Sequence, residues 1–159
     1  MNQKFKEIDM YEALCLAVSI DEERSEYFEN LAEATENKRV KNELQFLRDE
    51  ERKNAEYFSQ RLENEEGSEA ETGSCDPERL LHQWVEKEII LPFQNARTDG
   101  SVSSSLEALR LGADLQRKTI EFYNELLLHE KGDKEKEELK KVLSREEQNL
   151  KKLNIIMSY

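Results

Sequence analysis

Residues 12–16 read Glu-Ala-Leu-Cys-Leu, and residues 107–111 read Glu-Ala-Leu-Arg-Leu. The same offset of 95 residues aligns 8–62 with 103–157, and 11 of these 55 positions are identical. An internal repeat of this length indicates a duplicated structural unit. Duplicated helical hairpins that carry paired acidic positions are one way in which a protein builds a metal site between its two halves.

The spacing of apolar residues predicts that the first copy is a pair of helices. Over about 8–34, apolar residues recur at three- and four-residue steps, which is the period of one helix face. Asn37 is predicted to cap a second helix that continues to about residue 63, because its side chain can accept a hydrogen bond from a backbone N–H of the first turn. These two helices form the predicted hairpin 1, over about 8–63.

The second copy predicts hairpin 2, over about 104–157. A third helix is expected to run to His129 and to stop at Gly132, and a fourth helix is expected to start at Asp133. The predicted crossover, about 64–103, joins the two hairpins.

The crossover combines loop and helix signals. Residues 64–76 are acidic and contain Gly and Ser, and Asp76-Pro77 has the pattern of an N-cap followed by proline at the first helical position. A short helix is expected from Leu80 to about Leu91, ending near Pro92, with a polar loop over 96–105. Two hairpins and one long connection predict a single all-α domain over 1–159, a four-helix bundle whose crossover carries a short extra helix.

The composition restricts the classes of partner and location. The chain has 159 residues, 38% of them charged, and a net charge of -12. This charge argues against nucleic acid and against an anionic membrane as partners. The sequence has no apolar run of transmembrane length and no signal-peptide pattern, so we expect a cytoplasmic protein. Cys15 and Cys75 are the only cysteines, which excludes an in-chain zinc ribbon or rubredoxin-type iron centre.

A more specific pattern lies in the first predicted helix, which reads AVSIDEERSEYFENLA over 17–32. Asp21 stands seven residues before Phe28, and the repeat offset pairs these positions with Gln116 and Tyr123. The second and fourth helices carry Glu51-Arg-Lys-Asn54 and Glu146-Glu-Gln-Asn149. These segments resemble the rubrerythrin-like proteins of the ferritin-like superfamily, in which an acidic ligand precedes an aromatic residue by seven positions and two helices carry Glu-x-x-His.

The resemblance implies a ferritin-like four-helix bundle related to di-iron oxidases or peroxidases. It implies iron or another divalent metal as cofactor and a separate protein as electron donor. Carried over position by position, it assigns the metal ligands to Asp21, Glu51, Asn54, Gln116, Glu146 and Asn149.

The sequence departs from the family pattern at four of these six positions. Asn54 and Asn149 stand where the family has histidine, Gln116 stands for a glutamate, and Asp21 for another. Three carboxylates do not balance the charge of two divalent irons, so an oxygen-only site for one Mn²⁺, Mg²⁺ or Ca²⁺ is a second option. A one-residue slip of the alignment would make Glu22 or Glu23 the nearer acid.

The alternative interpretation is a metal-free core. Paired Asn residues can hydrogen-bond across a bundle and fix its register. An Arg or Lys between the carboxylates would also exclude a metal, and Arg48 and Lys118 lie closest in sequence to the ligand positions. The chain would then be a non-catalytic binding or assembly module, expected to be a homodimer.

Three further features receive structural interpretations. His82 and His129 fall outside the ligand positions, and Cys15 fits a small core side chain. Trp84, with the two isoleucines at 89–90, could pack the crossover onto the bundle or form a dimer surface.

Overall fold

The structure, a computed structural model, describes residues 10–65, 80–98 and 105–158, and every regular element in these ranges is helical. The prediction of an all-α protein is therefore confirmed over the described residues. The elements are α1 (Met10–Ala34), α2 (Lys38–Glu65), α3 (Leu80–Val85), the π-helical segment η2 (Glu86–Ile90), α4 (Leu91–Thr98), α5 (Ser105–His129) and α6 (Asp133–Met157).

Short turns connect the long helices pairwise, as the sequence predicts. Asn37 caps α2, since its Oδ1 accepts the backbone N–H groups of Arg39 at 3.0 Å and Val40 at 3.2 Å. Gly132 has extended backbone angles (φ -79°, ψ 133°) immediately before α6, and its carbonyl accepts the N–H of Lys136 at 2.9 Å. The predicted ends of the four long helices agree with the structure to within a few residues.

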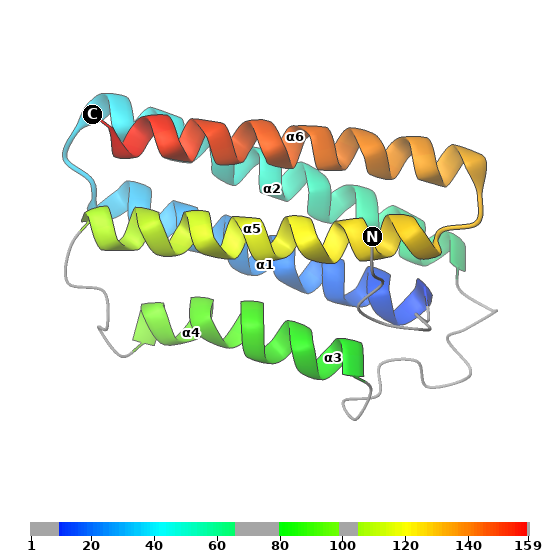
Figure 1. The fold of residues 1–159 in the computed structure, drawn as a ribbon. Helices are drawn as coiled ribbons and strands as arrows, with labels where there is room; N and C mark the ends of the chain where they lie inside the picture. The colour runs from blue at the N-terminus through cyan, green and yellow to red at the C-terminus, as the bar shows by residue number, and fades with distance from the viewer. Residues whose placement is uncertain (1–9, 66–79, 99–104, 159) are drawn as a thin grey trace.

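The four long helices enclose a common interior. Helix α1 packs along α2, α5 packs along α6, and the two hairpins meet through α1 with α5 and α2 with α6. In Figure 1 these four helices run side by side, and the α1–α2 turn, the start of α5 and the C-terminus lie at one end. The crossover helices α3, η2 and α4 run along α1 and α5.

The crossover departs from the prediction at Pro92. The helix was expected to end there and to be followed by a polar loop from Ala96, but it continues to Thr98. Before the proline the chain forms a π-helical turn, in which the Leu91 N–H bonds to the carbonyl of Glu86. Pro92 is thus the second residue of α4 and directly follows the π-helical turn, and it has no N–H to donate to the carbonyl groups of that turn. The Asp76-Pro77 cap, Cys75 and most of the acidic segment lie outside the described residues.

The hydrophobic core draws on every helix. Ile89 and Phe93 of the crossover are fully buried, and the Phe93 ring lies 5.1 Å from the Tyr27 ring, centroid to centroid. Trp84 is partly buried against the same core. The apolar residues of the crossover therefore pack it onto α1 and α5. None of the described helices is long and apolar enough to cross a membrane.

Candidate functional site

A ring of polar side chains interrupts the apolar interior at the middle of the four long helices. On α1, Asp21 and Arg24 lie one turn apart and face inward with Phe28, and all three are at most 1% exposed. The other helices contribute residues at the same three- and four-residue steps, which places them on inward faces. These residues are Glu51 and Asn54 on α2, Gln116, Thr119 and Tyr123 on α5, and Glu146 and Asn149 on α6.

The Arg24 guanidinium lies at the centre of this ring, between the carboxylates. Its Nη2 is 2.5 Å from Glu51 Oε1, and its Nη1 is 2.7 Å from Glu146 Oε2 and 3.5 Å from Asp21 Oδ1. Nη2 also donates to Gln116 Oε1. One side chain therefore bridges α1, α2, α5 and α6.

A second set of hydrogen bonds surrounds Glu146. Gln116 Nε2 donates to Glu146 Oε2 at 2.6 Å, and Asn54 Nδ2 donates to Glu146 Oε1 at 2.6 Å. Arg145 in turn donates to Asn54 Oδ1 at 3.1 Å. Each Glu146 oxygen thus accepts a hydrogen bond, which partly compensates the burial of this carboxylate.

Burial dominates the titration of the other two acids. It raises the pKa of Asp21 to about 8, with a further rise from the charge of Glu146, while Arg24 and the hydrogen bond from Tyr123 oppose the rise. Burial also raises the pKa of Glu51 well above its ordinary value, against the opposing charge of Arg24. One oxygen of each group, Asp21 Oδ2 and Glu51 Oε2, is buried and has no hydrogen-bond partner among the described residues.

Arg24 keeps its positive charge. Burial lowers the pKa of Arg24, but the carboxylates of Glu146, Glu51 and Asp21 outweigh this effect and raise it. Tyr123 donates from its hydroxyl to Asp21 Oδ1 at 2.5 Å. Burial, followed by the charge of Asp21, raises the pKa of Tyr123 well above its ordinary value, so this hydroxyl keeps its proton.

The structure connects five of the six sequence-predicted ligand residues. Asp21, Glu51, Gln116 and Glu146 contact Arg24 directly, and Asn54 joins them through Glu146. Asn149 is 4% exposed, but its Nδ2 has no hydrogen-bond partner among the described residues. The two Asn positions, equivalent by the repeat, therefore differ in their surroundings.

This arrangement fits a guanidinium and does not fit a metal ion. Carboxylates bind divalent ions at about 2.0–2.6 Å, and here the space on which the three acids converge is filled by Arg24. In the ranges 10–65, 80–98 and 105–158, no group of three or more His, Cys, Asp or Glu side chains is arranged to hold a metal.

Arg24 is the residue that the sequence interpretation missed. Of the two cations considered there, Arg48 pairs with Glu29 and Asp49 on the surface side of α2, and Lys118 pairs with Glu88. A signal for Arg24 was present, because it stands three residues after Asp21 and four before Phe28, on the inward face. Its repeat equivalent is Thr119, whose hydroxyl donates to the Leu115 carbonyl, so only one copy supplies a cation.

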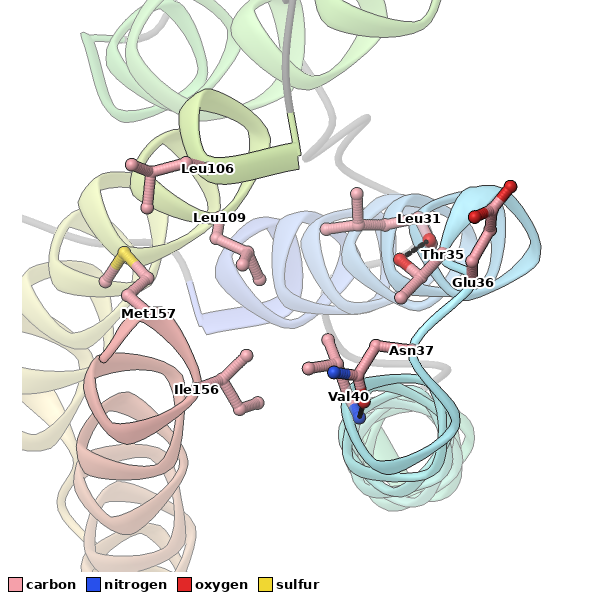
Figure 2. Close-up of a pocket in the computed structure, with 9 residues that line it drawn as sticks. All are labelled: Leu31, Thr35, Glu36, Asn37, Val40, Leu106, Leu109, Ile156 and Met157. Atoms are coloured by element: carbon pink, nitrogen blue, oxygen red, sulfur yellow. Dashed lines mark hydrogen bonds between the residues drawn. The ribbon is translucent and has the colours of Figure 1, made fainter. Parts of the chain in front are cut away.

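A separate cavity of about 360 Å³ opens at the end of the molecule that holds the α1–α2 turn. Figure 2 shows apolar side chains from α5 and α6 facing Leu31 and Val40 across it. Its polar residues serve local structure, since Thr35 donates to the Leu31 carbonyl and Asn37 caps α2. The described residues that line this cavity include no group of side chains suited to catalysis.

Comparison of the chain with protein-family models, with curated proteins and with solved structures gives no match in any of the three.

Proposed function

We propose that this chain is a ferritin-like four-helix bundle in which the Arg24 guanidinium takes the place of metal ions, and that it acts as a non-catalytic binding or assembly module. The observation that carries the proposal is the contact of Arg24 with all three acids of the cluster, Asp21, Glu51 and Glu146. The repeat and the Glu-x-x-Asn segments support the descent from a two-metal bundle. The presence of Arg24 between the acids supports the loss of metal chemistry in this bundle.

Charge balance supports a structural role for the cluster. One guanidinium neutralises one carboxylate, and the proton that Asp21 retains, with its pKa raised to about 8, removes a second negative charge at neutral pH. The guanidinium and the retained proton then leave a net charge of -1 on the cluster without a metal, and the raised pKa of Glu51 reduces this charge further. Buried ionic groups of this kind can fix the register of helices in a bundle, at some expense of stability.

Accessibility supports a role for the outer surface rather than for the cluster. Asp21, Arg24, Glu51, Gln116 and Glu146 are all 0% exposed, so no substrate reaches them in this conformation. Binding or self-association would therefore use the helix faces that surround the cluster. A homodimer is the assembly we propose, and sedimentation velocity over a range of protein concentrations tests it.

Elemental analysis and thermal unfolding test the metal-free state. The full chain is purified without chelator, and we expect far less than one Fe, Mn or Zn per chain and the same Tm with and without EDTA. Arg24→Ser is the informative variant, because it removes the cation and leaves the acids. We expect added Mn²⁺ to raise the Tm of this variant and to leave that of the wild-type protein unchanged.

Arg117→Ser is the matched control, since Arg117 is half exposed and its one ion pair among the described residues is with Asp114 in the same helix. It is expected to behave as the wild-type protein in both measurements. A stoichiometric metal in the purified wild-type protein, together with a lower Tm in EDTA, would overturn the proposal and favour a metal-binding bundle.

A further inference from the structure

A groove between α2 and α6 lies beside the buried cluster and is distinct from it. Its volume is about 580 Å³, which is within the range of about 300–1,000 Å³ typical of small-molecule sites. Tyr57 lines it from α2, and α6 supplies the other lining residues, which are Glu138, Lys141, Val142, Ser144 and Arg145. Positions 138, 141, 142 and 145 share one face of α6, because they are three and four residues apart.

Two cations in this groove lack a counter-ion in the part of the chain that the structure describes. Neither Lys141 nor Arg145 makes an ion pair with a described residue, although acidic residues outnumber basic ones by 36 to 24 in the chain. The Nε of Arg145 is buried and has no acceptor among the described residues. A buried guanidinium N–H without an acceptor is costly, so an acceptor in the groove would be favourable.

The acidic residue of the groove is already engaged. Glu138 accepts the hydroxyl of Tyr57 at 2.7 Å, and burial followed by this hydrogen bond raises the pKa of Tyr57, which keeps its proton at neutral pH. With one carboxylate and two cations, the described residues of the lining carry a net charge of +1. The half-buried Tyr57 ring adds apolar surface beside these charges, and Val142, which is 1% exposed, lines the groove beneath it.

We infer that the groove binds a small organic anion, a carboxylate or a phosphate monoester with an apolar body, whose oxygens contact Lys141 and Arg145 and whose body packs on Val142 and Tyr57. The site is separate from the buried acids, so the inference holds whether or not a metal can displace Arg24. Arg145 also donates to Asn54, which links the groove to the cluster through Glu146.

Titration of the ¹⁵N-labelled full chain, followed by amide chemical shifts, tests this site with phenyl phosphate, benzoate and benzyl alcohol. Saturable shifts in the α6 segment 138–145 and at Tyr57 are expected with an anionic probe and not with the neutral alcohol. Saturation by phenyl phosphate alone identifies a phosphate ester, saturation by benzoate alone identifies a carboxylate, and either result supports the inference.

Variants of two neighbouring lysines provide the matched pair. Lys141→Gln is expected to weaken binding about fivefold, the upper range for an exposed charge pair. Lys140→Gln removes the same charge one position away, where Lys140 pairs with Glu137 outside the groove, and is expected to change binding by less than about twofold. Arg145→Gln is expected to weaken it by about tenfold or more, because its hydrogen bond to an anion is charge-assisted.

Three outcomes would overturn the inference. They are the absence of saturable shifts with both anions, equal binding of benzyl alcohol, and equal weakening by Lys140→Gln and Lys141→Gln. Because Lys141 is exposed, its variant remains informative even if Arg145→Gln impairs folding through the lost bond to Asn54.

Discussion

The Arg24 guanidinium donates to Glu51 Oε1 at 2.5 Å across the α1–α2 hairpin, and neither side chain has exposed surface. The same guanidinium contacts Glu146 on α6 at 2.7 Å. One cation from the first repeat therefore holds an acid from each repeat. Its removal should affect the packing of both hairpins at once.

Arg24→Met is expected to destabilise the protein by about 3–5 kcal/mol at pH 8, because it leaves buried carboxylates without their cation. The loss should be smaller at pH 5, where the acids can take up protons. Urea unfolding at the two pH values measures both effects. Arg117→Met, which removes a half-exposed ion pair with Asp114, is expected to cost no more than about 1 kcal/mol. Equal losses for the two variants would contradict a central role for Arg24.

Asp21 makes the stability of the protein depend on pH. Its pKa is about 8 in the folded protein and 3.8 for the ordinary carboxyl. Between about pH 4 and pH 8, the folded protein therefore keeps a proton on Asp21 that the unfolded protein has released. The free energy of unfolding should therefore fall as the pH rises through this window, by at most about 1.4 kcal/mol per pH unit from this group. Glu51, whose pKa is also raised, acts in the same direction.

Asp21→Asn removes one of these two titrating groups. We expect a shallower fall in the free energy of unfolding between pH 5 and pH 8 than in the wild-type protein. Asp114→Asn is the control, because the Asp114 side chain is 67% exposed, and its pH profile should match the wild type. Parallel profiles for Asp21→Asn and the wild-type protein would show that Asp21 does not titrate in this window.

The sequence allowed the four long helices to be predicted because apolar periodicity, an Asn cap and a Gly-Asp turn are local signals. Pro92 was wrongly predicted to end the crossover helix. The spacing of apolar residues does not reveal the π-helical turn that precedes it. The inward position of Asp21 also followed from its spacing to Phe28, and those of Glu51 and Glu146 were implied by the resemblance to the rubrerythrin-like proteins. Their common partner did not, because an Arg on a helix is ordinarily exposed, and only the packing of four helices determines which cation is enclosed.

Tyr123→Phe tests the hydrogen bond that holds Asp21. The Tyr123 hydroxyl donates to Asp21 Oδ1 at 2.5 Å, and this bond lowers the pKa of Asp21. Its loss should destabilise the protein by about 1.5–3 kcal/mol at pH 8 and should raise the pKa of Asp21 further. Carboxyl ¹³C chemical shifts followed against pH measure that pKa.

Tyr27→Phe is the matched control for Tyr123→Phe. Tyr27 is also a buried tyrosine, but its hydroxyl donates to the neutral carbonyl of Ala108 at 2.7 Å. Loss of this hydrogen bond should lower the free energy of unfolding by about 1 kcal/mol and leave the titration of Asp21 unchanged. If the two variants move the pKa of Asp21 equally, the contact between Tyr123 and Asp21 does not control this titration.

Asn54 and Asn149 occupy equivalent positions in the two repeats and should respond differently to the same substitution. Asn54 donates to Glu146 at 2.6 Å and accepts from Arg145, whereas Asn149 Nδ2 has no partner among the described residues. Asn54→Leu should therefore leave two charged groups short of a bond, at about 1–3 kcal/mol for each buried group. Asn149→Leu removes an amide nitrogen that already has no hydrogen bond among the described residues. It should therefore lower the free energy of unfolding by less than Asn54→Leu does. Urea unfolding of the two variants at pH 7 compares them directly, and an equal loss would mean that the repeat preserves one role at both positions.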